Sequence, residues 1–247
     1  MKTLIGQVKL ETRLFFRRRD DLFWTLAFPV FFMLLFGAIY GNMGWEEGGM
    51  RVVDYLLPAI IVMALMTTGI MATATGFAEE RGKGVYRRLS LTPLKRHDII
   101  GGQIINRYLI ILAQALILIL IGTLAFKVSI VGNYLLFWGV LSLGGFCFLA
   151  LGFALASVIR SAKSATPVCM IVFFVMMFLG GIFFSTSIMP EYLQRFSNIL
   201  PATHLNNALR MVAVEGRGVN EVWRELLIVI GWFAGCLGLS VKFFRWE

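Results

Sequence analysis

Charged residues are scarce in this sequence. Asp, Glu, Lys and Arg make up 15% of the 247 residues and apolar residues make up 58%, whereas soluble domains contain about 25% charged and about 45–50% apolar residues. The apolar residues gather in blocks about as long as a helix that crosses a bilayer, roughly 20 residues. This composition leaves no length for a sizeable soluble domain, and we expect a single transmembrane domain over residues 1–247.

Cysteine and histidine are also rare, which limits the available chemistry. Cys147, Cys169 and Cys236 lie inside apolar blocks without CxxC or Cys/His zinc spacing, so we expect buried thiols rather than disulfides or metal ligands. His97 and His204 stand alone and are interpreted as surface or packed residues. The sequence contains no HExxH, GxSxG or GxxxxGK(S/T) pattern. We therefore predict no catalytic residue, no metal site and no nucleotide or other cofactor site in this chain.

Six long apolar runs dominate what is present. None shows the alternation of a half-buried strand, and a backbone in lipid must satisfy its own hydrogen bonds, which favours helices. The sequence therefore predicts an all-α polytopic membrane protein with six transmembrane helices. Their expected positions are 22–40, 55–78, 104–126, 134–159, 165–184 and 223–241.

The distribution of basic residues predicts the orientation. Seventeen of the 23 Lys and Arg residues lie in the N-terminal segment, the loop 79–98, the start of the third span, the turn 160–164 and the C-terminal tail. The other six lie on the opposite side, where seven acidic residues offset them. Because cytoplasmic loops carry the excess of Lys and Arg, we expect a multi-pass protein of the cell membrane with both termini in the cytoplasm. This bias also explains the net charge of +9, so no nucleic-acid partner is expected.

Residues 1–21 are too polar to span a membrane and follow the pattern of an amphipathic helix. Val8, Thr12, Phe15 and Phe16 share one helical face, while Lys and Arg residues occupy another. We interpret this segment as an interfacial helix on the inner leaflet of the bilayer. A disordered basic tail is the alternative.

Two segments between the spans are unusual. Residues 79–98 contain glycines that end the second span, then enough sequence for two helical turns, then a Thr-Pro pair that can begin the helix of the third span. Residues 185–222 carry Pro190 and Pro201, each of which can open a helix too short to span. We expect re-entrant or interfacial helices on the outer side there, since non-helical backbone at membrane depth is tolerated only where protein or a cavity covers it.

The loop 79–98 also carries a pattern of a known family. It contains Glu79-Glu80-Arg81-Gly82 and, after a short gap, Arg87-Arg88-Leu89-Ser90-Leu91-Thr92-Pro93-Leu94. This resembles the segment between spans two and three of ABC-2 type transporter permeases, where an acidic-Arg-Gly turn precedes a short coupling helix. The outer segment from Met189-Pro190 to Leu200-Pro201-Ala202-Thr203 resembles the outer helices of that family. With the N-terminal helix and the six spans, the resemblance covers essentially the whole chain.

The resemblance implies partners and functional residues. It implies a homodimer, or a heterodimer with a related permease, in which each permease binds a cytoplasmic ATPase subunit that holds ATP and Mg. The chain itself would not be an enzyme, and its loop helix would transmit closure of the ATPases to the spans. The implied ATPase-coupling residues are Glu80, Arg81, Gly82, Arg87, Arg88, Leu89, Pro93 and Leu94, with Glu80 and Arg81 anchoring the base of the loop.

The spans indicate the class of cargo only broadly. Their central parts contain no Asp, Glu, Lys or Arg, which suits an amphipathic or lipid-like substrate such as a drug, antibiotic, glycolipid or polysaccharide. The substrate path is left unassigned. Two alternative hypotheses are a secondary transporter or channel, which usually needs ionisable groups at depth, and a membrane-embedded transferase, which needs a catalytic constellation.

Overall fold

The computed structural model describes residues 2–17, 22–40, 51–89, 96–159, 161–183 and 186–243. The regular elements of this part of the chain are helices. In chain order they are α1 Lys2–Arg17, η1 Phe23–Ala27, α3 Phe28–Tyr40, α4 Val52–Met66, η2 Thr67–Ala72, α5 Thr73–Gly82, α6 Val85–Leu89, α7 Arg96–Phe126, α8 Tyr134–Val158, α9 Ala162–Leu179, η3 Thr186–Ile188, α10 Glu191–Ser197, α11 Pro201–Ala213 and α12 Val219–Phe243.

Six helical segments in the described ranges are long and apolar enough to cross a membrane, which confirms the predicted all-α, six-span architecture. They are Phe23–Tyr40, Val52–Gly82, Asp98–Phe126, Tyr134–Val158, Ala162–Leu179 and Val219–Phe243. The fifth ends at Leu179 rather than near 184, because Gly180 and Gly181 follow and Gly181 adopts a left-handed φ of 69°. The Thr-Pro pair predicted to begin the third helix lies outside the described residues, and α7 is helical from Arg96.

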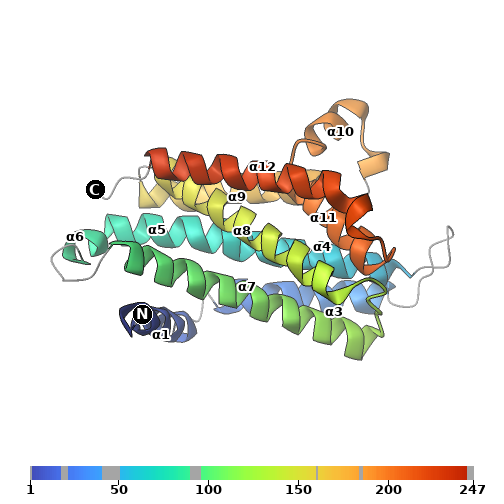
Figure 1. Cartoon of the computed structure of the whole chain (residues 1–247), viewed down its shortest axis with the longest axis horizontal. Helices are drawn as coiled ribbons and strands as arrows, with labels where there is room; N and C mark the ends of the chain where they lie inside the picture. Colours follow the sequence, from blue (N-terminus) through green and yellow to red (C-terminus); the bar gives the residue numbers. More distant parts are fainter. Residues whose placement is uncertain are drawn as a thin grey trace.

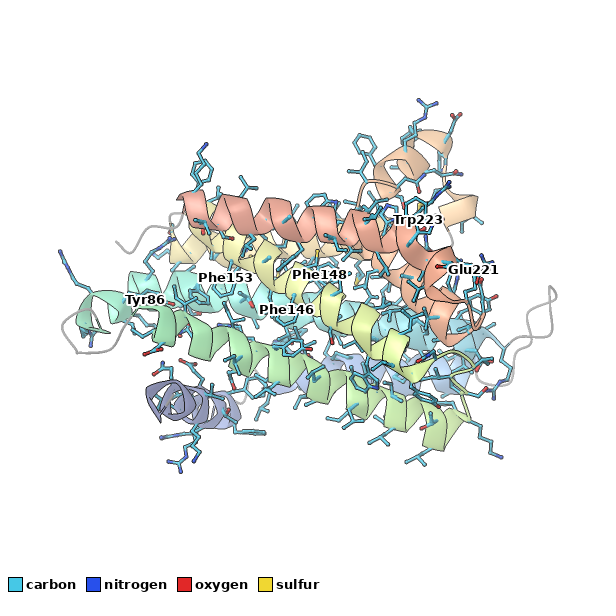
Figure 2. The ribbon with its side chains drawn as sticks, in the orientation of Figure 1. Tyr86, Phe146, Phe148, Phe153, Glu221 and Trp223 are labelled. Atoms are coloured by element: carbon cyan, nitrogen blue, oxygen red, sulfur yellow. The ribbon has the colours of Figure 1, made fainter. Side chains whose placement is uncertain are left out.

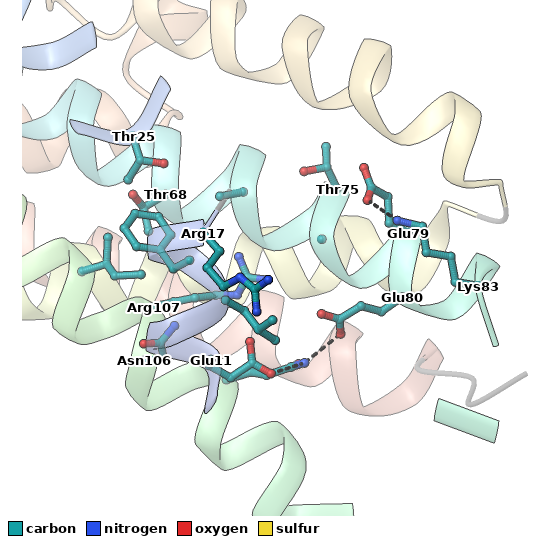
Figure 3. Close-up of a pocket in the computed structure, with 16 residues that line it drawn as sticks. Glu11, Arg17, Thr25, Thr68, Thr75, Glu79, Glu80, Lys83, Asn106 and Arg107 are labelled. Atoms are coloured by element: carbon teal, nitrogen blue, oxygen red, sulfur yellow. Dashed lines mark hydrogen bonds and ion pairs between the residues drawn. The ribbon is translucent and has the colours of Figure 1, made fainter. Parts of the chain in front are cut away.

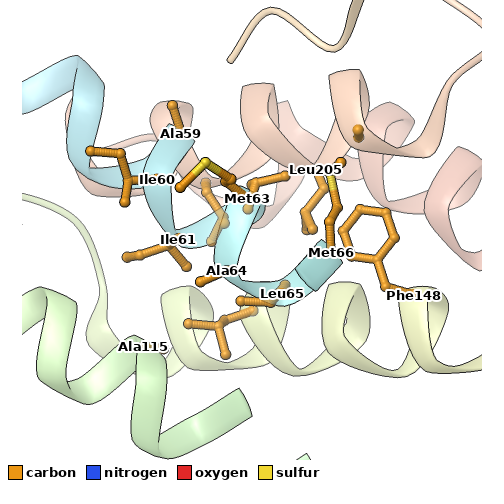
Figure 4. Packing of buried hydrophobic residues seen from close by; sticks show 14 of the residues in the cluster. Ala59, Ile60, Ile61, Met63, Ala64, Leu65, Met66, Ala115, Phe148 and Leu205 are labelled. Carbon is orange, nitrogen blue, oxygen red and sulfur yellow. The ribbon is translucent and has the colours of Figure 1, made fainter. Parts of the chain in front are cut away.

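The second span forms the centre of the bundle. Figure 1 shows α4 and α5 running between α8, α9 and α12 on one side and α3 and α7 on the other. Every residue of α4 from Leu57 to Met66 is buried. Around it lie Phe148 of α8, Leu205 of α11 and Ala115 of α7 (Figure 4). Because lipid tails are as apolar as these side chains, close van der Waals packing holds such a bundle together.

Two glycines allow α8 to cross the second span at very short range. A Cβ added at Gly152 would lie 2.1 Å from the carbonyl oxygen of Gly69. A Cβ added at Gly69 would lie 2.5 Å from the Cβ of Phe148. Real side chains do not tolerate either separation, so the two backbones meet only because both positions lack a side chain.

The first and second spans each contain a π-helical turn, η1 and η2, and a polar side chain links them. The hydroxyl of Thr68 in η2 donates to Oε1 of Gln114 at 2.7 Å, and the Gln114 amide donates to the carbonyl oxygen of Thr25 in η1. All three residues are buried. π-Helical turns leave backbone groups to be satisfied by side chains, and Gln114 satisfies one of them without bringing a charge into the bundle.

The two ends of the bundle differ. The turn between α5 and α6, helix α1 and the end of α12 lie at one end, and α10 lies at the other (Figure 1). Helix α10 begins at Glu191, directly after its N-cap Pro190, and α11 begins at Pro201, because the fixed φ of proline suits the start of a helix. The two short helices predicted from these prolines are therefore present.

Helix α1 is present over the segment predicted to be amphipathic, but its faces are arranged differently from the prediction. Thr12 donates to Oδ1 of Asn106 on α7 at 2.8 Å, and Gln7 packs against Gly102 of the same helix. Phe16, which we expected on the same face as Thr12, is 62% exposed. Because α7 presents polar side chains here, α1 turns a partly polar face towards it and leaves apolar side chains on the outside.

Candidate functional site

The turn between α5 and α6 projects from the end of the second span. Helix α5 ends where the N–H of Lys83 donates to the carbonyl oxygen of Glu79 at 2.9 Å and that of Gly84 donates to Arg81 at 2.9 Å. Gly84 has a φ of 66°, a conformation that glycine adopts at little cost. The chain then enters α6, so that the predicted break at the glycines of 79–98 and the short helix after it are both present.

Arg81 connects this turn to another span. Its guanidinium donates to the carbonyl oxygen of Ala156 at 3.1 Å and to that of Ile159. These carbonyls belong to the last turn of α8, where a helix has no internal donors left and carries partial negative charge. Arg81 therefore caps α8 from α5.

Glu80 connects the turn to α6 and α7 at once. Its Oε2 accepts hydrogen bonds from the hydroxyl of Tyr86 and from the side-chain amide of Gln103, each at 2.7 Å. Tyr86 is 3% exposed and Gln103 is also 3% exposed. Burial, and then the neighbouring charge of Glu80, raise the pKa of the Tyr86 phenol far above its usual value, so the phenol remains protonated and donates to Glu80.

Aromatic packing holds the same short helix. The Tyr86 ring stacks on Phe77 of α5 with centroids 5.9 Å apart, and Phe153 of α8 meets Phe77 edge-on at 4.4 Å. Tyr86 and Phe153 are labelled at this end of the bundle in Figure 2. Such pairs add about 0.5–1.5 kcal/mol each beyond their buried area. Helix α6, only five residues long, is thus attached to α5 and α7, and Phe77 of α5 extends this packing to α8.

The remaining residues implied for coupling extend from the end of α5 through α6 and beyond it. Gly82 is the last residue of α5. Arg87 and Arg88 are exposed, and Arg88 donates to the carbonyl oxygen of Lys83 at 2.9 Å. Leu89 ends α6, but its side chain lies outside the described part of the chain. Pro93 and Leu94 also lie outside the described residues.

Sequence reasoning did not identify Tyr86 and Gln103 as members of this cluster. Tyr86 stands within the quoted loop and Gln103 is an isolated polar residue near the start of a span. A polar glutamine near the start of one apolar span, after an acidic residue at the end of the preceding span, is a sequence pattern that could have indicated this contact. The pairing itself depends on how α5 and α7 lie beside each other.

A second polar cluster lies at the opposite end, between α11 and α12. His204 is 7% exposed; its Nδ1 contacts a carboxylate oxygen of Glu225 and its Nε2 lies 2.9 Å from the carbonyl oxygen of Asn198. Burial lowers the pKa of His204, but the hydrogen bonds to Glu225 and Asn198 and the charge of Glu225 outweigh burial and raise the pKa overall. Both ring nitrogens face acceptors, which favours the imidazolium form. His204 is a packed residue, as predicted.

The chain belongs to the ABC-2 type transporter family, whose model matches residues 7–214. It is similar to "Putative transport permease YvfS" from Bacillus subtilis (strain 168), with 24% identity over 257 residues that cover 99% of this chain and 98% of the relative. It is similar to "Probable multidrug ABC transporter permease YbhR" from Escherichia coli (strain K12), with 25% identity over 189 residues, 75% of this chain and 51% of the relative. A third relative, "ABC transporter G family member 20" from Dictyostelium discoideum, is 29% identical over 207 residues, 83% of this chain and 28% of the relative.

These matches establish a multi-pass permease subunit of an ABC transporter. The chain spans about half of the length of the second of these relatives and 28% of that of the third, whereas it matches the Bacillus permease over nearly its whole length. The family resemblance that the loop motif indicated is therefore confirmed over most of the chain.

Proposed function

We propose that this permease is the membrane subunit of an ABC exporter and that a separate ATPase subunit drives it through the turn between α5 and α6. The observation that carries the proposal is the way Glu80 and Arg81 tie this turn to neighbouring spans. Glu80 binds α6 and α7, and Arg81 binds the end of α8. A force applied to α6 would reach α5, α7 and α8 through hydrogen bonds to charged groups, the stronger class of protein hydrogen bond.

The family and the charge distribution support the proposed direction and partners. The basic bias of the α6 end supports a cytoplasmic position for that end, where the ATPase subunits would bind ATP and Mg. A second permease copy, identical or related, would complete the membrane part. Helix α1 would lie on the inner leaflet beside the ATPase, with Leu10 and Phe16 turned towards lipid.

The proposed cargo is amphipathic or lipid-like. The polar side chains buried in the middle of the spans, Thr68 and Gln114 among them, are uncharged, and ion-coupled transport usually needs ionisable groups at that depth. One relative is named as a multidrug permease, which supports a hydrophobic or amphipathic cargo for this chain as well.

The coupling role is tested at the end of α6. We expect Leu89 to dock in an apolar groove of the ATPase, where burying a leucine contributes about 1.5–3 kcal/mol and an unpaired carboxylate costs several kcal/mol more. Leu89→Asp should therefore abolish pull-down of the ATPase and export, while leaving membrane insertion intact. Arg88→Ala, one residue away, should do less, because an exposed charge contributes about 0–1 kcal/mol.

Two results would contradict this function. Normal ATPase binding and export by Leu89→Asp would show that the turn is not the coupling element. ATP hydrolysis by the rigorously purified chain, without its partner, would contradict the proposal that a separate subunit binds and hydrolyses ATP.

A further inference from the structure

A polar cavity opens at the α6 end of the bundle, on the face of α5 that is turned towards α1. Its volume is about 570 Å³. Its walls are α1, η1 at the start of the first span, the second span from η2 to α5, and α7. Figure 3 shows the side chains that line this cavity, with Glu79 and Lys83 directed towards each other. The cavity reaches from Lys83 at the turn to Thr25 and Thr68, whose side chains are buried between the spans.

The charges that line this cavity are balanced. Three lining residues are carboxylates and three are cations; they are Glu11, Glu79 and Glu80, and Arg17, Lys83 and Arg107. Glu79 and Lys83 form an ion pair with each other at 3.2 Å. A simple anion would still sit beside Glu11 and Glu80, and a simple cation beside Arg17 and Arg107, and both arrangements are unfavourable. A ligand with one positive and one negative group matches both sets.

The charges nearest the spans are held in fixed positions. The Arg107 guanidinium lies over the Phe77 ring, with its carbon 5.5 Å from the ring centroid. It also lies against Gly76, where an added Cβ would be 2.6 Å from Nη2. Glu80 is fixed by its two hydrogen bonds of 2.7 Å from Tyr86 and Gln103. A cationic and an anionic group are therefore preorganised in one cavity, which lowers the cost of ordering a ligand there.

The surroundings of the cavity indicate a lipid rather than a soluble molecule. Leu14, Phe15 and Ile110 form apolar parts of its wall. Helix α1, which forms one side, exposes Leu10 at 51% and Phe16 at 62% on its outer surface. Such a helix lies at the boundary between headgroups and acyl chains, so the cavity opens at the level where phospholipid headgroups lie.

We propose that this cavity binds the headgroup of a zwitterionic phospholipid with a primary ammonium, from the leaflet on the α6 side of the membrane. The phosphate lies by Arg107 and Arg17, and the ammonium lies by Glu80 and Glu11. A primary ammonium offers three donors to these carboxylates. A quaternary ammonium is recognised instead by aromatic rings, and Phe15 is the one aromatic ring among the described lining residues. This binding does not depend on the direction of transport.

The test measures lipid binding to the purified full chain in detergent by native mass spectrometry. The probes are phosphatidylethanolamine, phosphatidylcholine and phosphatidylglycerol with identical acyl chains, and soluble glycerophosphoethanolamine. We expect phosphatidylethanolamine to bind at least about tenfold more tightly than the other lipids, the size of effect that hydrogen bonds to charged groups produce. Equal binding of phosphatidylglycerol, or equally tight binding of the soluble headgroup, would overturn the proposal.

Two variants and a control locate the site. Arg107→Gln removes the cation that lies over the Phe77 ring, and Gly76→Ala displaces it without changing any charge, so each should weaken phosphatidylethanolamine binding by about tenfold or more. Lys163→Gln removes an exposed charge near the start of α9, outside the cavity, and should bind like the unmodified chain. Melting curves identify a variant that fails to fold. If a folded Gly76→Ala protein and a folded Arg107→Gln protein both retain full binding, this cavity is not the site.

Discussion

Replacing Tyr86 by phenylalanine removes one oxygen atom from the contact that holds α6. The hydroxyl donates to Glu80 at 2.7 Å, and the ring stacks on Phe77. Tyr86→Phe keeps the ring and its stacking, and Glu80 keeps its hydrogen bond from Gln103. The substitution therefore removes the short hydrogen bond between a buried phenol and a carboxylate, together with the longer contact of 3.4 Å from the same hydroxyl to Oε1 of Gln103.

The size of the effect follows from the type of bond. Hydrogen bonds to charged groups contribute about 1.5–3 kcal/mol, and about 1.4 kcal/mol corresponds to a tenfold change in an equilibrium constant. A five-residue helix has little stability of its own, so the lost bond acts directly on the local opening of α6. We expect the open population of α6 to rise about ten- to hundredfold.

Amide hydrogen exchange of the purified chain reports this opening. The N–H of Arg88 donates to the carbonyl oxygen of Gly84 at 3.2 Å, and its exchange rate should rise by the same factor in Tyr86→Phe. The matched control is Tyr108→Phe, which removes the 2.8 Å bond to Ser142 between α7 and α8 and should leave exchange in α6 unchanged. Unchanged exchange at Arg88 in Tyr86→Phe would refute the view that Glu80 and Tyr86 hold α6.

Three further outcomes are expected. Gly152→Ala should clearly lower the melting temperature in detergent, because the new Cβ would lie 2.1 Å from a carbonyl oxygen and overpacking costs about 1–3 kcal/mol. The control Gly139→Ala, which has nothing within 4 Å of the new atom, should leave the melting temperature unchanged. Equal melting temperatures for the two variants would refute the close helix crossing. The pKa of His204 is raised in the folded chain. Its contribution to stability is therefore present in full below its unfolded pKa of about 6.5 and is lost as pH rises through the folded pKa. Melting curves across this pH range should show the loss of stability, and this pH dependence should disappear in His204→Gln. Ser90→Cys, in a chain whose native cysteines have been replaced, should not be labelled by an impermeant thiol reagent added to intact cells. Labelling from outside would contradict the cytoplasmic location of the α6 end.

The number and kind of spans could be predicted from the amino-acid sequence alone. An apolar run in lipid must close its backbone hydrogen bonds within one helix, so composition and length locate helices without any knowledge of their neighbours. Local chemistry also determined the turn at Gly84, because glycine adopts a positive φ at little cost. It determined the helix starts next to Pro190 and at Pro201 as well, because proline fixes its own φ. The loop motif, a local pattern, was sufficient to indicate the family.

Which side chains contact one another depends on how the helices pack in three dimensions. Glu80 is 23 residues from Gln103 and Arg81 is 75 residues from Ala156, and no periodicity predicts the rotation and depth at which two apolar helices pack. The same holds for α1, whose polar face turned towards α7 because Asn106 lies there. Hydropathy measures how readily each helix enters lipid, whereas the contacts between helices depend on the shape and polarity of both partners, and only the folded bundle brings those together.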